Sequence, residues 1–198
     1  MVICQETSLI NSNPDRKVNV DKREKLKEII KQDALKFGDF VLASGKRSNY
    51  YLNGKMVTLS SKGLILAGEL IYDICRELEI DAVGGPTLGA DPIIGAVLAV
   101  AGLKGKHLDG FIVRKETKDH GTKSLIEGPL EEGDRVLMVE DVVTTAGTWI
   151  KAANAVKEHG ADIVTMVCLV DRESGAAENL RREGYDFKPL FFKSDFGV

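Results

Sequence analysis

A run of small and hydroxylated residues follows two adjacent carboxylates, Glu140 and Asp141. The run covers residues 142–148 and reads Val-Val-Thr-Thr-Ala-Gly-Thr. Threonine hydroxyls and free backbone N–H groups in such a turn can bind a phosphate, whereas the two acids would repel one. The acids suit the hydroxyl groups of a sugar instead. The stretch therefore predicts a site for a ribose that carries a phosphate.

The neighbouring residues predict a strand before these groups and a helix after them. Residues 136–139 are apolar and β-branched at both ends, which is typical of a strand buried on both faces. Residues 149–157 have the apolar spacing of a helix, whose positive N-terminal end would face the phosphate. Gly147 allows the backbone to approach closely. Taken alone, each acid would favour capping of the strand end or of the next helix; the Thr-Thr-Ala-Gly-Thr run that follows favours the sugar-phosphate site.

This stretch resembles the phosphoribosyl-pyrophosphate (PRPP) signature of type I phosphoribosyltransferases. The shared pattern is a hydrophobic strand, two acids, two further residues and a turn of Thr, Ser or Gly. The resemblance implies that the whole stretch binds PRPP and that Asp141 also acts in catalysis. The residues are Glu140, Asp141, Val142, Val143, Thr144, Thr145, Ala146, Gly147 and Thr148.

A second group of candidate residues is basic. Arg114, Lys115, Lys118 and His120 fall within seven residues, in a segment without strong periodicity over residues 114–133. A charge run of this kind is usually a solvated surface. PRPP, however, carries a phosphate and a pyrophosphate, and it needs more donors than backbone loops supply. The segment also resembles the catalytic loop of orotate phosphoribosyltransferases, which implies that all four residues bind PRPP and that Lys118 and His120 are catalytic.

Two other segments point to the base that would be recognised. Arg172 follows a predicted strand over residues 163–170, at the carboxyl end where doubly wound sheets bind ligands. A guanidinium there can bind a planar carboxylate through paired hydrogen bonds, although a salt bridge with a neighbouring acid is the alternative. Residues 37–53 resemble the N-terminal hood of orotate phosphoribosyltransferases. The resemblance assigns Arg172 and Thr144 to orotate.

The order of elements predicts an α/β fold with a mainly parallel central sheet flanked by helices, and ligands at the carboxyl edge of the strands. The resemblance implies the type I phosphoribosyltransferase fold with a small N-terminal hood. The expected divisions are a mobile leader over residues 1–18, the hood over 19–60, and a core domain over 61–198 with a flexible loop over 115–130.

Apolar spacing predicts the remaining elements of the hood and the core. In the hood we expect a helix over residues 21–38 and strands over 40–43 and 50–52. In the core we expect helices over 60–78, 92–103 and 176–184, and strands over 81–83, 111–113 and 189–192. The loop over 84–91 resembles the one that borders the pyrophosphate, although glycine-rich turns are also common for geometric reasons. Ala43 and Gly89 stand where many bacterial members of the family carry lysines.

Composition narrows the functional classes. The 198 residues include 27 Lys and Arg against 30 Asp and Glu, so no overall positive field would recruit nucleic acid. Cys4, Cys75 and Cys168 are odd in number and lack metal-ligand spacing, which favours reduced thiols and a cytoplasmic location. No apolar run is long enough to span a membrane.

The resemblance covers residues 25–198 and implies an orotate phosphoribosyltransferase. Such an enzyme transfers the phosphoribosyl group of PRPP to orotate in de novo UMP biosynthesis, giving orotidine 5'-phosphate and pyrophosphate. It also implies Mg²⁺ held mainly by substrate, with no metal site built from protein residues, and a homodimer whose loop places Lys118 and His120 in the partner's site. Two alternatives stay open: a phosphoribosyltransferase for another nucleobase, and a PRPP-sensing regulator of the same fold.

Overall fold

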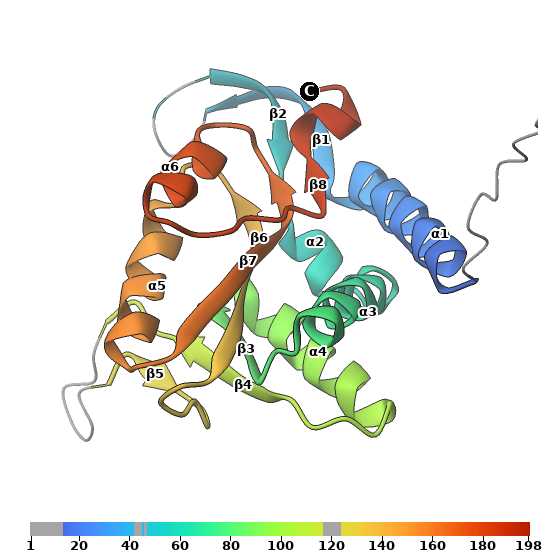
Figure 1. Ribbon diagram of the computed structural model, residues 1–198. Helices are drawn as coiled ribbons and strands as arrows, with labels where there is room; N and C mark the ends of the chain where they lie inside the picture. The colour runs from blue at the N-terminus through green and yellow to red at the C-terminus, as the bar shows by residue number, and fades with distance from the viewer. Residues whose placement is uncertain (1–13, 42–44, 46, 117–123) are drawn as a thin grey trace, which may run out of the picture.

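The structure, a computed structural model, describes residues 14–41, 45, 47–116 and 124–198 (Figure 1). The strands in these ranges are β1 (Leu35–Val41), β2 (Arg47–Leu52), β3 (Ala82–Pro86), β4 (Asp109–Val113), β5 (Ile126–Glu127), β6 (Arg135–Val143), β7 (Asp162–Asp171) and β8 (Phe191–Phe192). The helices are α1 (Pro14–Ile29), α2 (Lys55–Thr58), α3 (Ser61–Leu78), α4 (Ala90–Leu103), α5 (Gly147–Glu158) and α6 (Ala176–Arg182). A π-helical turn, η1 (Ile30–Ala34), and a 3-10 turn, η2 (Lys193–Phe196), complete the described elements.

The central sheet has the strand order β5-β4-β3-β6-β7-β8, and β1 and β2 form a separate antiparallel pair. Neighbouring strands of the central sheet are parallel except β4 and β5. Figure 1 shows α3 and α4 on one face and α5 and α6 on the other. The predicted fold class, a mainly parallel sheet flanked by helices, is confirmed. The chain runs from β3 outward to β4 and then back to β6 on the other side of β3, so the direction of winding reverses between β3 and β6.

The interior of β6 is buried from both sides, as its apolar residues predict. Leu137 and Val139 contact the hydrophobic cluster formed with α3 and α4. Val136 and Met138 contact the second cluster, formed with α5 and α6. All four side chains are fully buried. Because successive residues of a strand face opposite sides, a strand covered by helices on both faces must be apolar at every position.

The first helix begins earlier than predicted, and the chain becomes extended before the predicted end of that helix. Helix α1 begins at Pro14 rather than at residue 21, so the predicted leader over residues 1–18 overlaps it, and residues 1–13 lie outside the described residues. Strand β1 begins at Leu35, where the prediction still had helix. Leu35 pairs with Leu52 and Phe37 with Tyr50. This pairing overrides the helical apolar spacing that continues through η1.

The segment over residues 115–130, which is predicted to be a flexible loop, contains a strand toward its C-terminal end. Strand β5 lies within it and pairs with β4, where Ile126 lies opposite Val113. Ile126 and Leu130 are buried, which anchors this end of the segment to the core. Lys118 and His120 fall in residues 117–123, outside the described residues.

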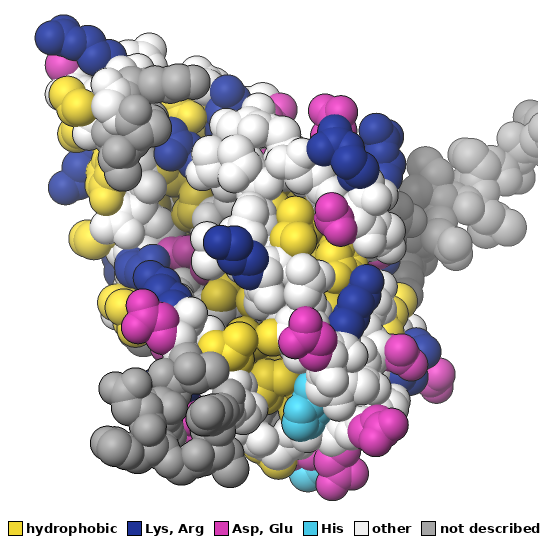
Figure 2. Space-filling view, turned by 90° about the vertical axis from the view of Figure 1, so that its left-hand side faces the viewer, with side chains coloured by type: hydrophobic (Ala, Val, Ile, Leu, Met, Phe, Trp, Pro, Cys, Tyr) yellow, Lys and Arg dark blue, Asp and Glu magenta, His cyan; other side chains and the backbone are white. Residues whose placement is uncertain are grey.

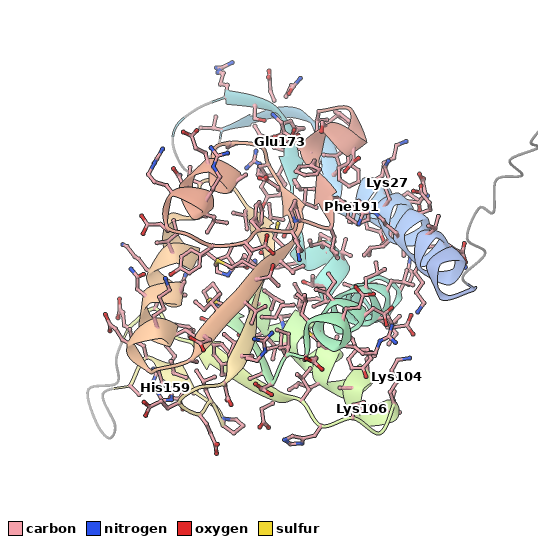
Figure 3. The ribbon with its side chains drawn as sticks, in the orientation of Figure 1. Lys27, Lys104, Lys106, His159, Glu173 and Phe191 are labelled. Carbon is pink, nitrogen blue, oxygen red and sulfur yellow. The ribbon has the colours of Figure 1, made fainter. Side chains whose placement is uncertain are left out.

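The C-terminal segment connects the central sheet to the hood. Phe191 of β8 lies beside α1, where the guanidinium of Arg23 is 4.8 Å from the centre of its ring (Figure 3). The face formed by α5 and α6 carries acidic and basic side chains intermixed, in keeping with the small net charge of -3 (Figure 2). None of the helices in the described ranges is both long enough and apolar enough to cross a membrane.

Candidate active site

A cavity of about 470 Å³ opens at the carboxyl ends of β3 and β6, where the winding of the sheet reverses. Every residue of the predicted stretch 140–148 lines it. Thr144, Thr145 and Thr148 are exposed, so the turn is open to a ligand rather than sealed inside the core. The other lining residues are Lys55, Thr87, Leu88, Gly89, Lys115 and Trp149.

The turn at the start of α5 has the geometry of an anion site. Ala146 adopts a left-handed conformation with φ 62°, and the first residue of α5 is Gly147. The Ile150 N–H donates to the Ala146 carbonyl at 2.8 Å, so the helical hydrogen-bond pattern starts there and leaves the preceding N–H groups at a helix N-terminus. Asn179 of α6 donates to the Thr145 carbonyl at 3.0 Å and holds the turn from outside.

The acidic pair lies within β6 rather than after it, because the strand continues to Val143. The Asp141 N–H donates to Glu140 Oε1 at 2.9 Å, and the Val142 N–H donates to Asp141 Oδ1 at 2.8 Å. Asp141 Oδ2 accepts a hydrogen bond from the Lys55 ammonium at 2.9 Å. The backbone and Lys55 thus fix the orientation of both carboxylates.

Burial and neighbouring charges alter the acid–base properties of this cluster. Burial, together with the adjacent Asp141, raises the pKa of Glu140 to about 8. Burial also raises the pKa of Asp91 at the start of α4. For Lys55, burial lowers the pKa, but the hydrogen bond and the charge of Asp141 outweigh it and the net pKa is raised. The two shifts thus have the same direction: both the Glu140 carboxyl and the Lys55 ammonium hold their protons more tightly than they would in water.

Two glycines allow the backbone to come close to the acidic pair. A Cβ on Gly54 would lie 2.9 Å from Val142 Cγ2 and 3.0 Å from Asp141 Cβ. A Cβ on Gly89 would overlap carboxylate oxygens of Glu140 and Asp141. The departure from the family pattern at Gly89 thus has a physical reason, since this arrangement leaves no room there for a side chain.

Lys55 is a site residue that the sequence analysis missed. It is the first residue of α2, and its backbone N–H donates a hydrogen bond to Asn53 Oδ1 at 3.2 Å. Lys55 is 86 positions away from its partner Asp141 in the sequence. The sequence signal that could have identified it is the order Asn-Gly-Lys directly after the hood strand. Asn-Gly is typical of a turn, and such a turn can direct the lysine toward the central sheet.

The predicted basic residues are only partly brought together. Lys115 lines the main cavity. Arg114 lines an adjoining cavity of about 340 Å³, which also includes Lys115 and Thr148, and its guanidinium forms an ion pair with Glu127 at 3.3 Å. The structure therefore places Arg114 beside the main cavity and not in its lining.

Arg172 lies at the end of β7, and its backbone N–H donates to the Val143 carbonyl at 2.9 Å. The Arg172 guanidinium donates to the Tyr50 hydroxyl at 3.3 Å. The neighbouring acids accept hydrogen bonds from backbone N–H groups: Asp171 from Glu173 at 2.9 Å, and Glu173 from Ser194 at 2.8 Å. Among the described residues the Arg172 guanidinium thus contacts Tyr50 of the hood, and it forms no ion pair with Asp171 or Glu173.

Comparison with known proteins agrees with this site. A family model described as "Phosphoribosyl transferase domain" matches residues 54–183, which leaves β1 and β2 outside the match. An orotate phosphoribosyltransferase of Pyrococcus abyssi is 47% identical over 176 residues, covering 88% of this chain and 94% of that protein. The chain belongs to the orotate phosphoribosyltransferase family. The resemblance in the sequence is therefore confirmed.

Solved orotate phosphoribosyltransferase structures extend the similarity to the fold. The Mycobacterium tuberculosis H37Rv enzyme in complex with Fe(III) dicitrate is 35% identical with a TM-score of 0.80, covering 89% of this chain and 99% of that one. The same enzyme in complex with PRPP is 33% identical with a TM-score of 0.76, at the same coverage. The type I phosphoribosyltransferase fold, predicted from the resemblance, is thereby confirmed.

Proposed function

We infer that this protein transfers the phosphoribosyl group of PRPP to orotate, giving orotidine 5'-phosphate and pyrophosphate, a step of UMP biosynthesis. The observation that carries this inference is the open cavity at the reversal point of the sheet, lined along one side by residues 140–148. Membership of the orotate phosphoribosyltransferase family supports the same reaction.

In this proposal the two ends of the stretch bind different parts of the ribose phosphate. Thr144, Thr145 and Thr148, with the N–H groups at the start of α5, hold the 5-phosphate. Glu140 and Asp141 hold the ribose hydroxyls. Breaking the bond to pyrophosphate leaves positive charge on the ribose ring, and the nearby carboxylate of Asp141 stabilises it electrostatically.

The leaving pyrophosphate requires positive charge and hydrogen-bond donors. We assign this role to Arg114, Lys115, Lys118 and His120, of which Lys115 lines the cavity. One preorganised donor of this kind is typically worth about 3 kcal/mol of the barrier. Mg²⁺, held mainly by PRPP oxygens and water, would neutralise part of the pyrophosphate charge. Carboxylate and hydroxyl oxygens at the cavity are donor types that suit this ion.

We also propose that the enzyme is a cytoplasmic homodimer in which Lys118 and His120 act in the partner's site. Free, buried Cys75 and Cys168 support a reducing location. Mixing two inactive variants, Lys118→Ala and Asp141→Asn, tests the dimer. Each mixed dimer would contain one intact site and should have up to about half of the activity of a wild-type dimer. Activity that stays at the level of the separate variants would contradict action across the interface.

A spectrophotometric assay tests the reaction itself. Orotate should be consumed when PRPP and Mg²⁺ are present, and adenine, hypoxanthine and uracil should not be converted in parallel assays. Turnover of another base would indicate a phosphoribosyltransferase of different specificity. PRPP binding without turnover of any base would indicate the regulatory alternative.

A further inference from the structure

The ammonium of Lys55 lies among carboxylates at the proposed PRPP site. Its Nζ is 2.9 Å from Asp141 Oδ2, and the charge of Glu140 also acts on it. The positive charge of Lys55 also acts on the pKa of Asp91, in the lowering direction. Asp91 Oδ1 is buried without a hydrogen-bond partner in the described part of the chain. Three carboxylates from two segments, β6 and the start of α4, therefore interact with one lysine.

The two partners of the ion pair differ in their freedom to move. The Asp141 side chain is 8% exposed and is held by the Val142 N–H, whereas the Lys55 side chain is 42% exposed and lines the cavity. A lysine side chain is a flexible four-carbon chain, so Nζ can move into the cavity while the backbone of α2 stays in place. Lys55 is therefore the partner that can change its contact.

Few cations are available on this side of the cavity. The opposing loop contributes Thr87, Leu88 and Gly89, and Gly89 has no room for a side chain. Among the described lining residues, the positive charges belong to Lys55, from the hood side, and Lys115, from the end of β4. An anion that enters between these segments would meet both ammonium groups.

The ion pair uses part of the acceptor capacity of Asp141 and holds Nζ at the position where the ribose hydroxyls would bind. The proposed function requires Asp141 to accept hydrogen bonds from the ribose, yet Oδ2 already accepts one from Lys55. We propose that Lys55 is a pyrophosphate-binding residue of the PRPP site, which exchanges its ion pair with Asp141 for the pyrophosphate group when PRPP binds. This inference rests on the proposed function and adds a residue to it.

The exchange leaves no charge without a partner. Removing one member of a buried ion pair is costly because the other charge stays buried and unpaired. Here the ribose hydroxyls and the pyrophosphate arrive together on one molecule, so Asp141 gains hydroxyl donors as Lys55 gains anionic oxygens. Inorganic pyrophosphate brings only one of the two groups, so it should bind more weakly than PRPP, although its contact is still with Lys55.

Calorimetric titration with inorganic pyrophosphate in magnesium-containing buffer tests the assignment. Lys55→Met should weaken binding at least about tenfold, the usual effect of losing one charged hydrogen bond. Lys55→Arg should retain most of the affinity. The matched control is Lys62→Met, which removes an equal charge paired with Asp33 outside the cavity and should leave the affinity within about twofold. Thermal unfolding of each variant verifies that it is folded.

Asp141→Asn separates pyrophosphate binding from a purely structural ion pair. Because the substitution releases Lys55, it should tighten pyrophosphate binding, and the double variant Lys55→Met/Asp141→Asn should lose that gain. Unchanged pyrophosphate affinity in a folded Lys55→Met variant would overturn the inference, even if the wild-type protein converts orotate. Absence of orotate turnover in the wild type, with the pyrophosphate results as expected, would instead contradict the proposed function alone.

Discussion

The Tyr50 hydroxyl accepts a hydrogen bond from Arg172 Nη2 at 3.3 Å, and the Arg172 guanidinium carbon lies 5.2 Å from the centre of the Tyr50 ring. The contact joins β2 of the hood to the end of β7 in the core. It orients the guanidinium without using its remaining donors, and Nε has no partner in the described residues. Arg172 therefore keeps donors for a carboxylated base, as the orotate assignment requires.

Replacing Arg172 by lysine should impair orotate recognition specifically. Lysine keeps the charge but lacks the planar pair of donors and the stacking surface that Tyr50 contacts. We expect the KM for orotate to rise at least about tenfold, with the KM for PRPP within about threefold. Steady-state kinetics with each substrate varied measures both. Arg182→Lys on the exposed surface of α6 is the control, and an equal rise in both KM values would argue against a base-specific role.

Glu140 should make the protein less stable as the pH rises. Its pKa of about 8 in the folded protein lies above the ordinary value of 4.5, so the folded state binds this proton more tightly than the unfolded chain. The free energy of unfolding should therefore decrease between these two pH values. One pKa unit corresponds to about 1.4 kcal/mol, which suggests a loss of about 2–4 kcal/mol.

Urea unfolding across this pH range measures the effect. The Glu140→Gln variant should lose most of the decrease because its side chain does not ionise. Exposed Glu131 provides the control, and Glu131→Gln should follow the wild-type profile. The prediction fails if Glu140→Gln and the wild type show parallel profiles.

Gly89→Ala should damage the acidic pair, whereas Gly95→Ala should be harmless. The methyl group at residue 89 would overlap oxygens of Glu140 and Asp141 and must displace them. Overpacking of this kind costs about 1–3 kcal/mol, and we expect at least about a tenfold loss in kcat/KM for PRPP. Gly95 lies in α4 with no atom within 4 Å of an added Cβ, so alanine there should stabilise the helix by about 0.5–1 kcal/mol. Equal activity of both variants would contradict the crowding at Gly89.

The Thr148 hydroxyl should contribute to binding of the phosphate. Thr148→Val preserves the shape of the side chain but removes the donor, and we expect ribose 5-phosphate to bind about fivefold to tenfold more weakly. Thr148→Ser should restore most of the affinity. Calorimetric titration gives the three dissociation constants. Equal affinities of Thr148→Val and the wild type would restrict phosphate binding to the backbone N–H groups and the remaining threonines.

The local pattern around β6 predicted both the strand and the turn because their determinants are close in sequence. Apolar residues 136–139 form the buried part of the strand, and α5 begins within the predicted small-residue turn. The strand was predicted to end at the acids, but pairing of Val142 with Val170 of β7 extends it. Such pairing with a neighbouring strand is not visible in the residues of β6 alone.

Long-range contacts explain what the sequence could not show. Leu35 and Phe37 continue an apolar helical spacing, yet they become extended because residues of β2 pair with them. Lys55 looks like an ordinary surface lysine in the sequence, and only its contact with Asp141 places it in the site. Arg172 was found from its place after a strand, but its contact with Tyr50 depends on how the hood lies over the core.

The hood is held to the core partly by the side chains proposed to bind substrate, since Tyr50 contacts Arg172 and Lys55 contacts Asp141. Ligands that compete for these partners would loosen one attachment while they fill the cavity. Amide hydrogen exchange in β1 and β2 should therefore respond to pyrophosphate and to orotate separately, although neither strand belongs to the phosphate turn. The exchange rates in this two-stranded sheet would then show which half of the site is occupied.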